Sequence, residues 1–493
     1  MPTRNKPDLT LHTDFYELNM MQTYISQGRQ NQKAVFEMFF RKMPFGNGYA
    51  IFAGLQQVID YIQNLRFTDS DIKYLESLHD FTPEFIDYLK HFKFRGTIRS
   101  AVEGDLVFNH EPILQIEGTL PECTLVETAI LNMVNYSILI ATKASRIRLA
   151  ADDQPIMEFG SRRAQDVDAA IWGTRAAYIG GFDSTSNVLA GKKFGIPVAG
   201  TIAHSLIEAY GNEYEAFMAY ASTHKNCIFL VDTFDTIHSG IPNAIKVAKK
   251  MGNKINFVGI RLDSGDMAYL SKKARKMLDD AGFPNAKITA SNGLDEHLIL
   301  SLKMQKARID SWGVGTKLIT AYDQPSLGGV YKLVAVEDPK THQLRDSMKV
   351  SDNVEKITTP GLKQVWRITE RKDGKSEGDY VTTIDEDPRK QDHVYMFHPQ
   401  FTYINKTIDD FYAKPVLKTI FKDGKLVYHQ PNIKDIRKHA QNSVSLLWPE
   451  YSRLMNPQTY PVDLSKKLWT RKQNLLKHIH DNVEKMQKNS NEE

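Results

Sequence analysis

The stretch NCIFLVDTFDTIHSGIPNAIKVAKKMGNKINFVGIRLDSGD, residues 226–266, decides the fold of this chain. Two apolar runs, CIFLV and INFVGI, each lead into acidic residues, and the helical pattern GIPNAIKVAKKMG separates them. The ends of the two runs lie about 30 residues apart, which is the length of one βαβ unit. Continuous apolar strands are typical of a parallel sheet that helices cover. The stretch therefore predicts two neighbouring strands of such a sheet.

The same pattern extends on both sides of this stretch. Short apolar runs, each followed by polar residues or glycine, alternate with helical segments from residue 155 to about residue 336. The further runs are PIMEF (155–159), IPVAGTIA (196–203), KITA (287–290), RIDSW (308–312) and GVYKLVAV (329–336). With about seven strands, the pattern favours an irregular TIM-like α/β barrel, which can be open, over a perfect eightfold barrel.

The flanking regions differ from this repeat. Residues 1–150 mix short β runs with helical segments and predict an N-terminal α/β domain of the α+β type. Residues 151–350 hold the barrel and its site. Residues 351–493 form a C-terminal segment, in which RKDGKSEGD and FKDGKLVYH indicate hairpin turns and residues 466–489 an amphipathic helix.

Composition restricts the class of protein. The 493 residues are 41% hydrophobic and 25% charged, and the net charge of +4 comes without a clustered basic face, so we expect no nucleic-acid partner. The two cysteines, Cys123 and Cys227, form no metal motif and indicate a reducing compartment. The apolar region 125–147 carries Glu127, two asparagines and Lys143, which predicts a packed helix rather than a membrane span. We therefore expect a cytoplasmic protein with no membrane partner, and the N-terminus has no apolar secretory segment.

Polar or small residues follow almost every predicted strand. Because the carboxyl ends of parallel strands meet at one edge of the sheet, these residues are candidates for a common site. They are Gly160–Arg163, His204, Asp232, Asp235, Arg261, Asp263–Asp266, Ser291–Gly293, Gly313, Gly315 and Thr316.

This set suits a phosphorylated sugar. The SNG and GVGT segments can present backbone N–H groups to a phosphate. The guanidinium groups of Arg162 and Arg261 suit a pyrophosphate or a carboxylate. Asp263 and Asp266 could hold ribose hydroxyls or Mg²⁺, which prefers oxygen ligands.

Each feature also has a purely structural interpretation. DSGD can be an N-cap with an acidic first turn, GVGT can be a turn, and a lone histidine more often caps a helix or lies in a core. The chain has no GxxxxGK[ST] or GxGxxG fingerprint after a strand. The convergence of six strand ends favours a functional site over six independent caps.

Several motifs together resemble one known family. LHTDFYELNM, EFGSRR, GGFDSTSN, AGTIAHS, LVDTFDT, GIRLDSGD, SNGLDE and GVGTKLIT occur in this order. They are similar to motifs of nicotinate phosphoribosyltransferase, and YKLVAVED continues the match to about residue 340. The resemblance implies the type II phosphoribosyltransferase fold, with a C-terminal extension that packs on the N-terminal domain. It also implies that nicotinate, 5-phosphoribosyl 1-diphosphate, ATP and water give nicotinate mononucleotide, diphosphate, ADP and phosphate, the first step of NAD synthesis from nicotinate.

The resemblance assigns roles to residues of this chain. His204 would be phosphorylated by ATP, and Asp232 would orient it. Arg261 would meet the nicotinate carboxylate or the pyrophosphate, and Asp263 would hold the ribose hydroxyls. The remaining substrate-binding residues would be Tyr16, Phe159, Arg162, Asp183, Thr201, Ser291, Asn292, Gly293, Gly315 and Thr316.

The family also implies a homodimer with shared active sites, in which Tyr16 and Phe159 would sandwich the pyridine ring. Mg²⁺ would be the cofactor, held by Asp263 and Asp266, and ATP a co-substrate. The first alternative is nicotinamide phosphoribosyltransferase, where an acidic residue such as Asp183 would meet the amide. The second, from another class, is a non-catalytic regulator that binds a phosphosugar, although a regulator needs no nucleophile. The quinolinate enzyme would be much shorter.

Overall fold

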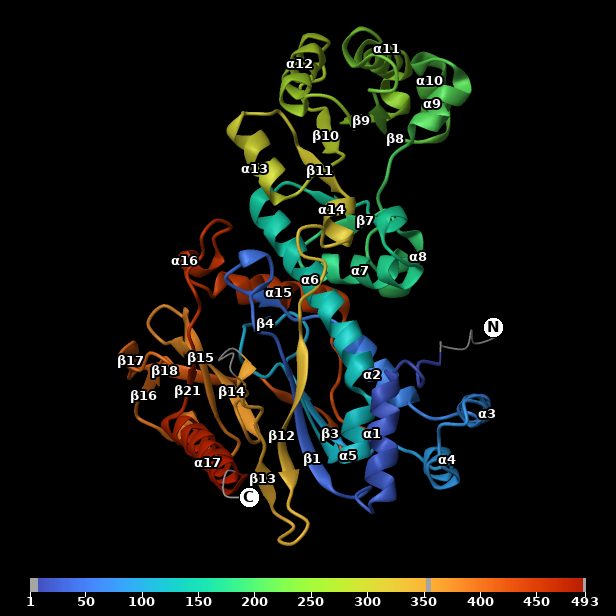
Figure 1. Ribbon diagram of the computed structural model, residues 1–493. Helices are drawn as coiled ribbons and strands as arrows, with labels where there is room; N and C mark the ends of the chain where they lie inside the picture. The colour runs from blue at the N-terminus through green and yellow to red at the C-terminus, as the bar shows by residue number, and fades with distance from the viewer. Residues whose placement is uncertain (1–7, 352–355, 491–493) are drawn as a thin grey trace. The chain divides into compact units, whose positions relative to one another are not determined.

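The computed structural model describes residues 8–351 and 356–490. The chain divides into two compact units (Figure 1). The first unit comprises Met1–Ile138, Ser326–Asn432 and His439–Glu493, and the second comprises Leu139–Pro325 and Ile433–Lys438. This division differs from the three predicted segments because strands from both ends of the chain build the same sheet of the first unit.

The second unit contains the parallel sheet that the sequence predicts. Its six strands lie in the order β7-β6-β11-β10-β9-β8, with β7 and β8 at the two edges. The strands are β6 (Ile156–Glu158), β7 (Ser184–Thr185), β8 (Asn226–Leu230), β9 (Asn256–Leu262), β10 (Lys287–Ser291) and β11 (Ser311–Val314). The fold is thus a mixed α/β architecture with an open, curled half-barrel.

Two predicted barrel strands are wrong. Residues 196–203 form no strand, and only Val198 bridges to Thr185. Pro197 lacks an N–H to donate and Gly200 weakens a strand, so an apolar run alone does not make one here. The run at 329–336 forms β12 (Val330–Glu337), which pairs with an antiparallel sheet of the first unit instead. Five predicted strands are confirmed, and the short strand β7, which the sequence did not predict, brings the barrel sheet to six strands rather than seven.

Helices connect and cover the parallel strands. They are α7 (Val167–Ile179), α8 (Val188–Phe194), α9 (His204–Tyr210), α10 (Glu213–Thr223), α11 (Ile241–Met251), α12 (Met267–Asp280), α13 (Glu296–Met304) and α14 (Thr316–Ile319). The helix α12 shows the local logic, because Asp266 accepts the N–H of Tyr269 and caps its start.

The main sheet of the first unit has seven strands in the order β13-β12-β1-β5-β3-β19-β20. They are β1 (Lys33–Phe39), β3 (Thr97–Ser100), β5 (Leu114–Thr119), β12, β13 (Leu344–Asp346), β19 (Lys418–Lys422) and β20 (Lys425–Leu426). Two further strands, β2 (Ala50–Ile51) and β4 (Leu106–Val107), pair with each other. The C-terminal strand β19 pairs with the N-terminal strand β3, so the predicted packing of the extension on the N-terminal domain is confirmed.

A second sheet of this unit lies within the C-terminal segment. Its order is β18-β14-β15-β21, built from β14 (Lys363–Glu370), β15 (Ser376–Thr383), β18 (Phe411–Pro415) and β21 (Val462–Leu464), and β16 (Val394–Phe397) pairs with β17 (Asn405–Ile408). Both predicted hairpin turns are confirmed, between β14 and β15 and between β19 and β20. At the second turn Asp423 and Gly424 both have positive φ, as a two-residue hairpin turn requires.

The helices of the first unit complete its layers. They are α1 (Phe15–Ser26), α2 (Leu55–Asn64), α3 (Asp69–Ser77), α4 (Pro83–Lys90), α5 (Leu120–Leu125), α16 (Pro449–Ser452) and α17 (Lys466–Ser490), with parts of α6 (Glu127–Ala151) and α15 (Ile433–Ser445). The predicted terminal helix is confirmed by α17. The segment Leu120–Ala151 is long and apolar enough to cross a membrane, but 67% of its most apolar window is buried within the protein, as expected for a core helix.

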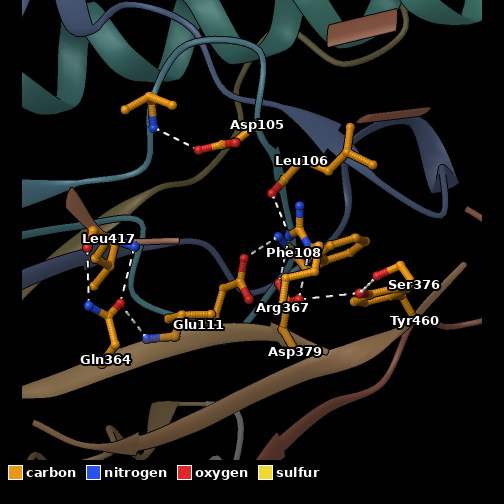
Figure 2. Close-up of polar contacts among 12 residues, drawn as sticks. Asp105, Leu106, Phe108, Glu111, Gln364, Arg367, Ser376, Asp379, Leu417 and Tyr460 are labelled. Carbon is orange, nitrogen blue, oxygen red and sulfur yellow. Dashed lines mark hydrogen bonds and ion pairs between the residues drawn. The ribbon is translucent and has the colours of Figure 1, made fainter. Parts of the chain in front are cut away.

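A buried polar cluster links β14 and β15 to β4 in the first unit (Figure 2). Arg367 on β14 donates to both carboxylate oxygens of Asp379 on β15, at 3.0 and 2.7 Å, and to the carbonyl oxygen of Leu106 at 2.8 Å. Burial and the charge of Asp379 raise the pKa of the neighbouring Glu111 well above its usual value.

Candidate active site

The register of the parallel sheet brings the ends of its strands together. Arg261 on β9 is level with Leu230 on β8 and with Thr289 on β10. Ser291, at the end of β10, is level with Gly313 on β11. Polar residues that lie far apart in the sequence therefore meet at the carboxyl edge, which is where parallel sheets bind ligands.

Arg261 lies at the centre of this edge. Its Nε donates to the Ser291 hydroxyl at 2.8 Å, Nη1 to the Thr201 hydroxyl at 3.1 Å, and Nη2 to Asp263 at 2.8 Å. The guanidinium carbon also lies 5.4 Å from the centre of the Phe159 ring. A guanidinium has five N–H groups, so these three contacts hold its plane and leave two N–H groups for a ligand.

Asp263 is ionised and firmly held. Burial raises its pKa, but hydrogen bonds from Ser291 and Arg261 outweigh that effect and lower the pKa below its usual value. One carboxylate oxygen, Oδ1, accepts from both neighbours, while Oδ2 lies 3.7 Å from Nε2 of His204. This second oxygen is the one available to a ligand.

His204 is the first residue of α9, and Ala203 is the N-cap. Because Ala203 occupies the N-cap position and the His204 ring nitrogen meets Thr233, the interpretation that His204 only caps its helix is not supported. Its Nδ1 lies 3.0 Å from the hydroxyl oxygen of Thr233, and its side chain is 37% exposed. The ring is therefore oriented on one edge and accessible from outside.

The hydrogen bonds of Asp232 go to residues other than His204, which the resemblance implied it would orient. Its Oδ2 accepts the backbone N–H of Asp263 at 2.8 Å and the hydroxyl of Ser264 at 2.6 Å. Within residues 8–351 and 356–490, no hydrogen bond joins Asp232 to His204, and Asp232 Oδ1 is buried without a partner. Asp232 and Thr233 are consecutive, so their side chains leave the backbone in different directions, and Thr233 is the one that reaches the ring.

The two segments predicted to bind phosphate both turn sharply at glycines. Asn292 and Gly293 have φ of 78° and 65°, so this exposed loop turns back in the left-handed region. Gly315 precedes α14, and a Cβ at Gly313 would lie 2.6 Å from carbons of the Phe159 ring. Only glycine allows that approach, which sets α14 and Thr316 against the Phe159 loop.

Glu158, which sequence reasoning missed, supports that loop. It is buried, and its carboxylate accepts from the Gly160 N–H at 2.5 Å and from the hydroxyls of Thr174 and Thr185 at 2.9 and 2.6 Å. Burial raises its pKa in spite of these bonds. Glu158 thereby joins β6, β7 and α7 beneath Phe159. The only sequence signal for Glu158 was its position in the EFG motif, and that motif does not show which residues lie next to Glu158 in the fold.

Four predicted site residues lie elsewhere or have other partners. Arg162, in the turn after β6, is exposed. The carboxylate of Asp183 accepts from Arg148 at 2.5 Å and from Arg437 at 2.6 Å. Asp266 Oδ1 caps α12. Tyr16, on α1 of the first unit, is 47% exposed, and burial of its hydroxyl together with nearby Glu127 raises its pKa to about 12.

The donor set for a metal ion is limited to oxygen. In the described part of the chain, no group of three or more His, Cys, Asp or Glu side chains could hold a metal ion. Magnesium usually takes one or two carboxylates and completes its shell with water and substrate phosphates. The free Oδ2 of Asp263 and the unpartnered Oδ1 of Asp232 fit such an ion in chemical type.

Comparisons with known proteins agree along most of the chain. The N-terminal domain of nicotinate phosphoribosyltransferase matches residues 11–135, the nicotinate phosphoribosyltransferase family matches residues 155–369, and the C-terminal domain matches residues 362–472. The chain is 55% identical to a nicotinate phosphoribosyltransferase of Bacillus subtilis, with 97% of each chain covered, and 36% identical to one of Mycobacterium tuberculosis, with 93% of this chain and 92% of that protein covered. The crystal structure of human nicotinic acid phosphoribosyltransferase matches with a TM-score of 0.81 at 30% identity, covering 94% of this chain and 99% of that one.

Proposed function

This chain belongs to the nicotinate phosphoribosyltransferase family, and we propose that it makes nicotinate mononucleotide from nicotinate and 5-phosphoribosyl 1-diphosphate. The reaction couples to ATP, which with water gives ADP and phosphate. The observation that carries this proposal is the arrangement around Arg261, in which one guanidinium holds Ser291, Thr201 and Asp263 at the carboxyl edge of the sheet.

The transfer is a displacement at the anomeric carbon of the ribose. The pyridine nitrogen of nicotinate forms the new C–N bond, and the C–O bond to diphosphate breaks with its electron pair on the leaving oxygen. The protein's task is to align the two reactants and to stabilise the departing charge, because no proton moves at the reacting carbon. The developing oxocarbenium character is comparable to that of glycosyl transfer.

The site residues divide between the parts of the substrates. The free N–H groups of Arg261 bind the nicotinate carboxylate or the diphosphate, and Phe159 and Thr201 line the pyridine pocket, with Arg162 available at its rim. Asp263 Oδ2 accepts the ribose hydroxyls. The 5-phosphate is bound by the backbone N–H groups of Ser291, Asn292, Gly293, Gly315 and Thr316.

His204 is the group that ATP phosphorylates. A ring nitrogen of its imidazole, at the start of α9, attacks the γ-phosphorus, the bond from that phosphorus to the β-phosphate oxygen breaks, and ADP leaves. Thr233 orients the ring, and Asp263 lies beside the nitrogen that faces it. Asp232 acts one step away by holding the backbone and hydroxyl of the loop that carries Asp263.

Magnesium belongs to the proposal as the ion that accompanies the phosphates. Asp263 would hold it, with Asp266 through water and with the unpartnered oxygen of Asp232 as a further donor. When bound, it supplies charge neutralisation at the diphosphate.

A homodimer with shared sites completes the proposal. Tyr16 is exposed on the first unit and offers an aromatic face, while Phe159 offers the other from the second unit. Two such rings on opposite sides of a pyridine give a favourable stacked arrangement. We place the enzyme in the cytoplasm, where its two buried free cysteines stay reduced.

The alternative substrate is nicotinamide. That reading needs an acidic side chain for the amide, and Asp183 was its candidate. Both oxygens of Asp183 accept from arginines, and Oδ2 also accepts the N–H of Ile156 at 2.9 Å, so this carboxylate is already occupied. A cationic centre at Arg261 suits an anionic carboxylate better than a neutral amide.

Release of diphosphate separates the candidates. The chain with 5-phosphoribosyl 1-diphosphate and Mg²⁺ is assayed with nicotinate or nicotinamide, each with and without ATP. Turnover with nicotinate that ATP stimulates is the expected result. Turnover with nicotinamide but not with nicotinate contradicts the substrate assignment. Absence of turnover with both substrates supports the non-catalytic regulator.

A further inference from the structure

An ion pair between a half-buried lysine and a shielded carboxylate links the two segments that precede α13 and α14. The Nζ of Lys317 lies 2.6 Å from Oδ2 of Asp295. Asp295 is the N-cap of α13 and follows the Ser291–Gly293 loop, and Lys317 is the second residue of α14, after the Gly313–Thr316 loop. One contact therefore joins the starts of the two helices that follow the loops proposed to bind phosphate.

Asp295 is committed on both oxygens. Its Oδ1 accepts the N–H of Leu298 at 2.8 Å while Oδ2 accepts from Lys317, and its side chain is only 12% exposed. Burial raises its pKa, but the hydrogen bonds from Lys317 and Leu298 lower the pKa below its usual value. The carboxylate is thus ionised and neutralised by Lys317.

The residue after Asp295 anchors the same point to the interior. The buried carboxylate of Glu296 contacts Lys143 at 2.8 Å and Arg146 at 2.7 Å, both on α6. Lys143 also pairs with Asp323, which follows α14, at 2.8 Å. The start of α13 is therefore fixed to α6, and Lys317 extends that anchor to the first turn of α14.

We propose that Lys317 is a positioning residue for the phosphate-binding loops and not itself a phosphate ligand. Its ion pair with Asp295 sets the backbone N–H groups of Ser291–Gly293 and of Gly313–Thr316 toward one phosphate group. The inference rests on the proposed function, which places the 5-phosphate of the phosphoribosyl substrate at these loops.

The alternative is that Lys317 binds the phosphate directly, as a lysine next to a glycine-rich loop often does. The geometry opposes this, because its ammonium already donates at 2.6 Å to a carboxylate that is ionised and largely buried. Moving Lys317 to a phosphate would leave that carboxylate unpaired, which is costly for a group so shielded from water.

A double-mutant cycle decides between the two readings. Lys317→Met, Asp295→Asn and the double variant are compared with wild type by calorimetric binding of 5-phosphoribosyl 1-diphosphate with Mg²⁺, and by kcat and KM with nicotinate. Asp295→Asn keeps a good N-cap, so it removes the ion pair without removing the cap. Lys276→Met is the matched control, because Lys276 forms an exposed ion pair with Asp280 on α12.

A positioning role predicts similar losses in both single variants. Each should raise Kd and KM about 3- to 30-fold, within the range for residues of one network, with kcat nearly unchanged. The Kd of the double variant should be no higher than that of the weaker-binding single variant. Lys317→Arg, which keeps the positive charge, should bind nearly as tightly as wild type. Lys317→Gln, which retains a donor for Asp295, replaces Lys317→Met if that variant does not fold, and it should show a smaller rise.

A direct ligand predicts the opposite behaviour of Asp295→Asn. Freed from its partner, Lys317 would then bind the phosphate as well as or better than in wild type, and this result overturns the inference, as do additive losses in the double variant. Absence of turnover in wild type contradicts the proposed function, whereas calorimetry still tests the ion pair. If wild type does not bind the phosphoribosyl substrate at all, the inference fails with it.

Discussion

Nδ1 of His204 lies 3.0 Å from the hydroxyl oxygen of Thr233, so the residue that orients the ring is the neighbour of the one expected. A hydroxyl can donate to an unprotonated ring nitrogen or accept from a protonated one, and in either case it fixes the plane of the ring. The nearest carboxylate to the ring is Asp263, 3.7 Å from Nε2. Thr233 and Asp263 together, rather than a single carboxylate, therefore hold the orientation of the His204 ring.

Thr233→Val should slow phosphorylation of His204 without abolishing it. The variant keeps the shape and removes one neutral hydrogen bond of about 0.5–1.5 kcal/mol, which corresponds to about 2- to 10-fold in rate. Thr233→Ser keeps the hydroxyl and should behave nearly as wild type. Rapid-quench measurement of phosphoenzyme formation checks this, and equal rates for the valine and serine variants would show that the hydroxyl has no role.

Arg261→Lys should impair the reaction although it keeps the charge. A planar group with contacts to Ser291, Thr201 and Asp263 is replaced by a point charge that cannot hold all three. Loss of charge-assisted contacts should cost about 1.5–3 kcal/mol, or about 10- to 150-fold in kcat/KM for nicotinate. Near-normal steady-state kinetics would place Arg261 outside the site.

Shared active sites can be tested by complementation. If Tyr16 of one subunit serves the site of the other, mixing a Tyr16→Ala chain with an Arg261→Ala chain produces some sites with both residues intact. Heterodimers isolated with two different affinity tags should recover part of the lost activity. Verified heterodimers that remain as inactive as the parents would remove the shared-site arrangement.

Glu111→Gln should flatten the dependence of stability on pH. Burial and the charge of Asp379 raise the pKa of Glu111 well above the usual 4.5, so the folded protein keeps a proton that the unfolded chain releases. Wild type should therefore lose stability as pH rises above about 4.5 toward the raised pKa, because the folded state binds more protons over that interval. Glutamine carries no such proton.

Denaturant unfolding from pH 5 to pH 8 measures this difference. Glu84→Gln on the exposed face of α4 serves as the control and should leave the slope of wild type unchanged. An identical slope in Glu111→Gln and wild type would mean that Glu111 is ionised in the folded protein.

The sequence predicted the parallel strands well where apolar runs and turns coincided. CIFLV and INFVGI became β8 and β9 with Asp232 and Arg261 near their ends, because a buried strand must be apolar and its polar neighbours collect at the edge. The run IPVAGTIA was wrongly predicted as a strand because the prediction rested on its apolar composition. Pro197, which has no backbone N–H to donate, argues against a strand there. The run GVYKLVAV formed a strand, but apolar composition does not specify which sheet a strand joins.

Which residues form the site was easier to predict than which of them contact one another. Arg261, Asp263 and Ser291 meet as expected, because all three come from adjacent strand ends. The choice of Thr233 over Asp232 depends on the direction in which two consecutive side chains leave the backbone, and the role of Glu158 depends on three segments that meet only in the fold. No spacing in the sequence encodes either.

The central claim is that ATP phosphorylates His204 and that this step drives nicotinate turnover. The direct measurement incubates wild type and His204→Asn with γ-³²P-ATP and Mg²⁺ and counts acid-labile, base-stable label on the protein. Asparagine is a polar residue of similar reach that cannot accept a phosphoryl group in this way, and circular dichroism confirms that the variant folds. We expect label on wild type, none on the variant, and ATP stimulation of nicotinate turnover in wild type alone. Label that persists in His204→Asn, or ATP stimulation that survives the substitution, would contradict the account.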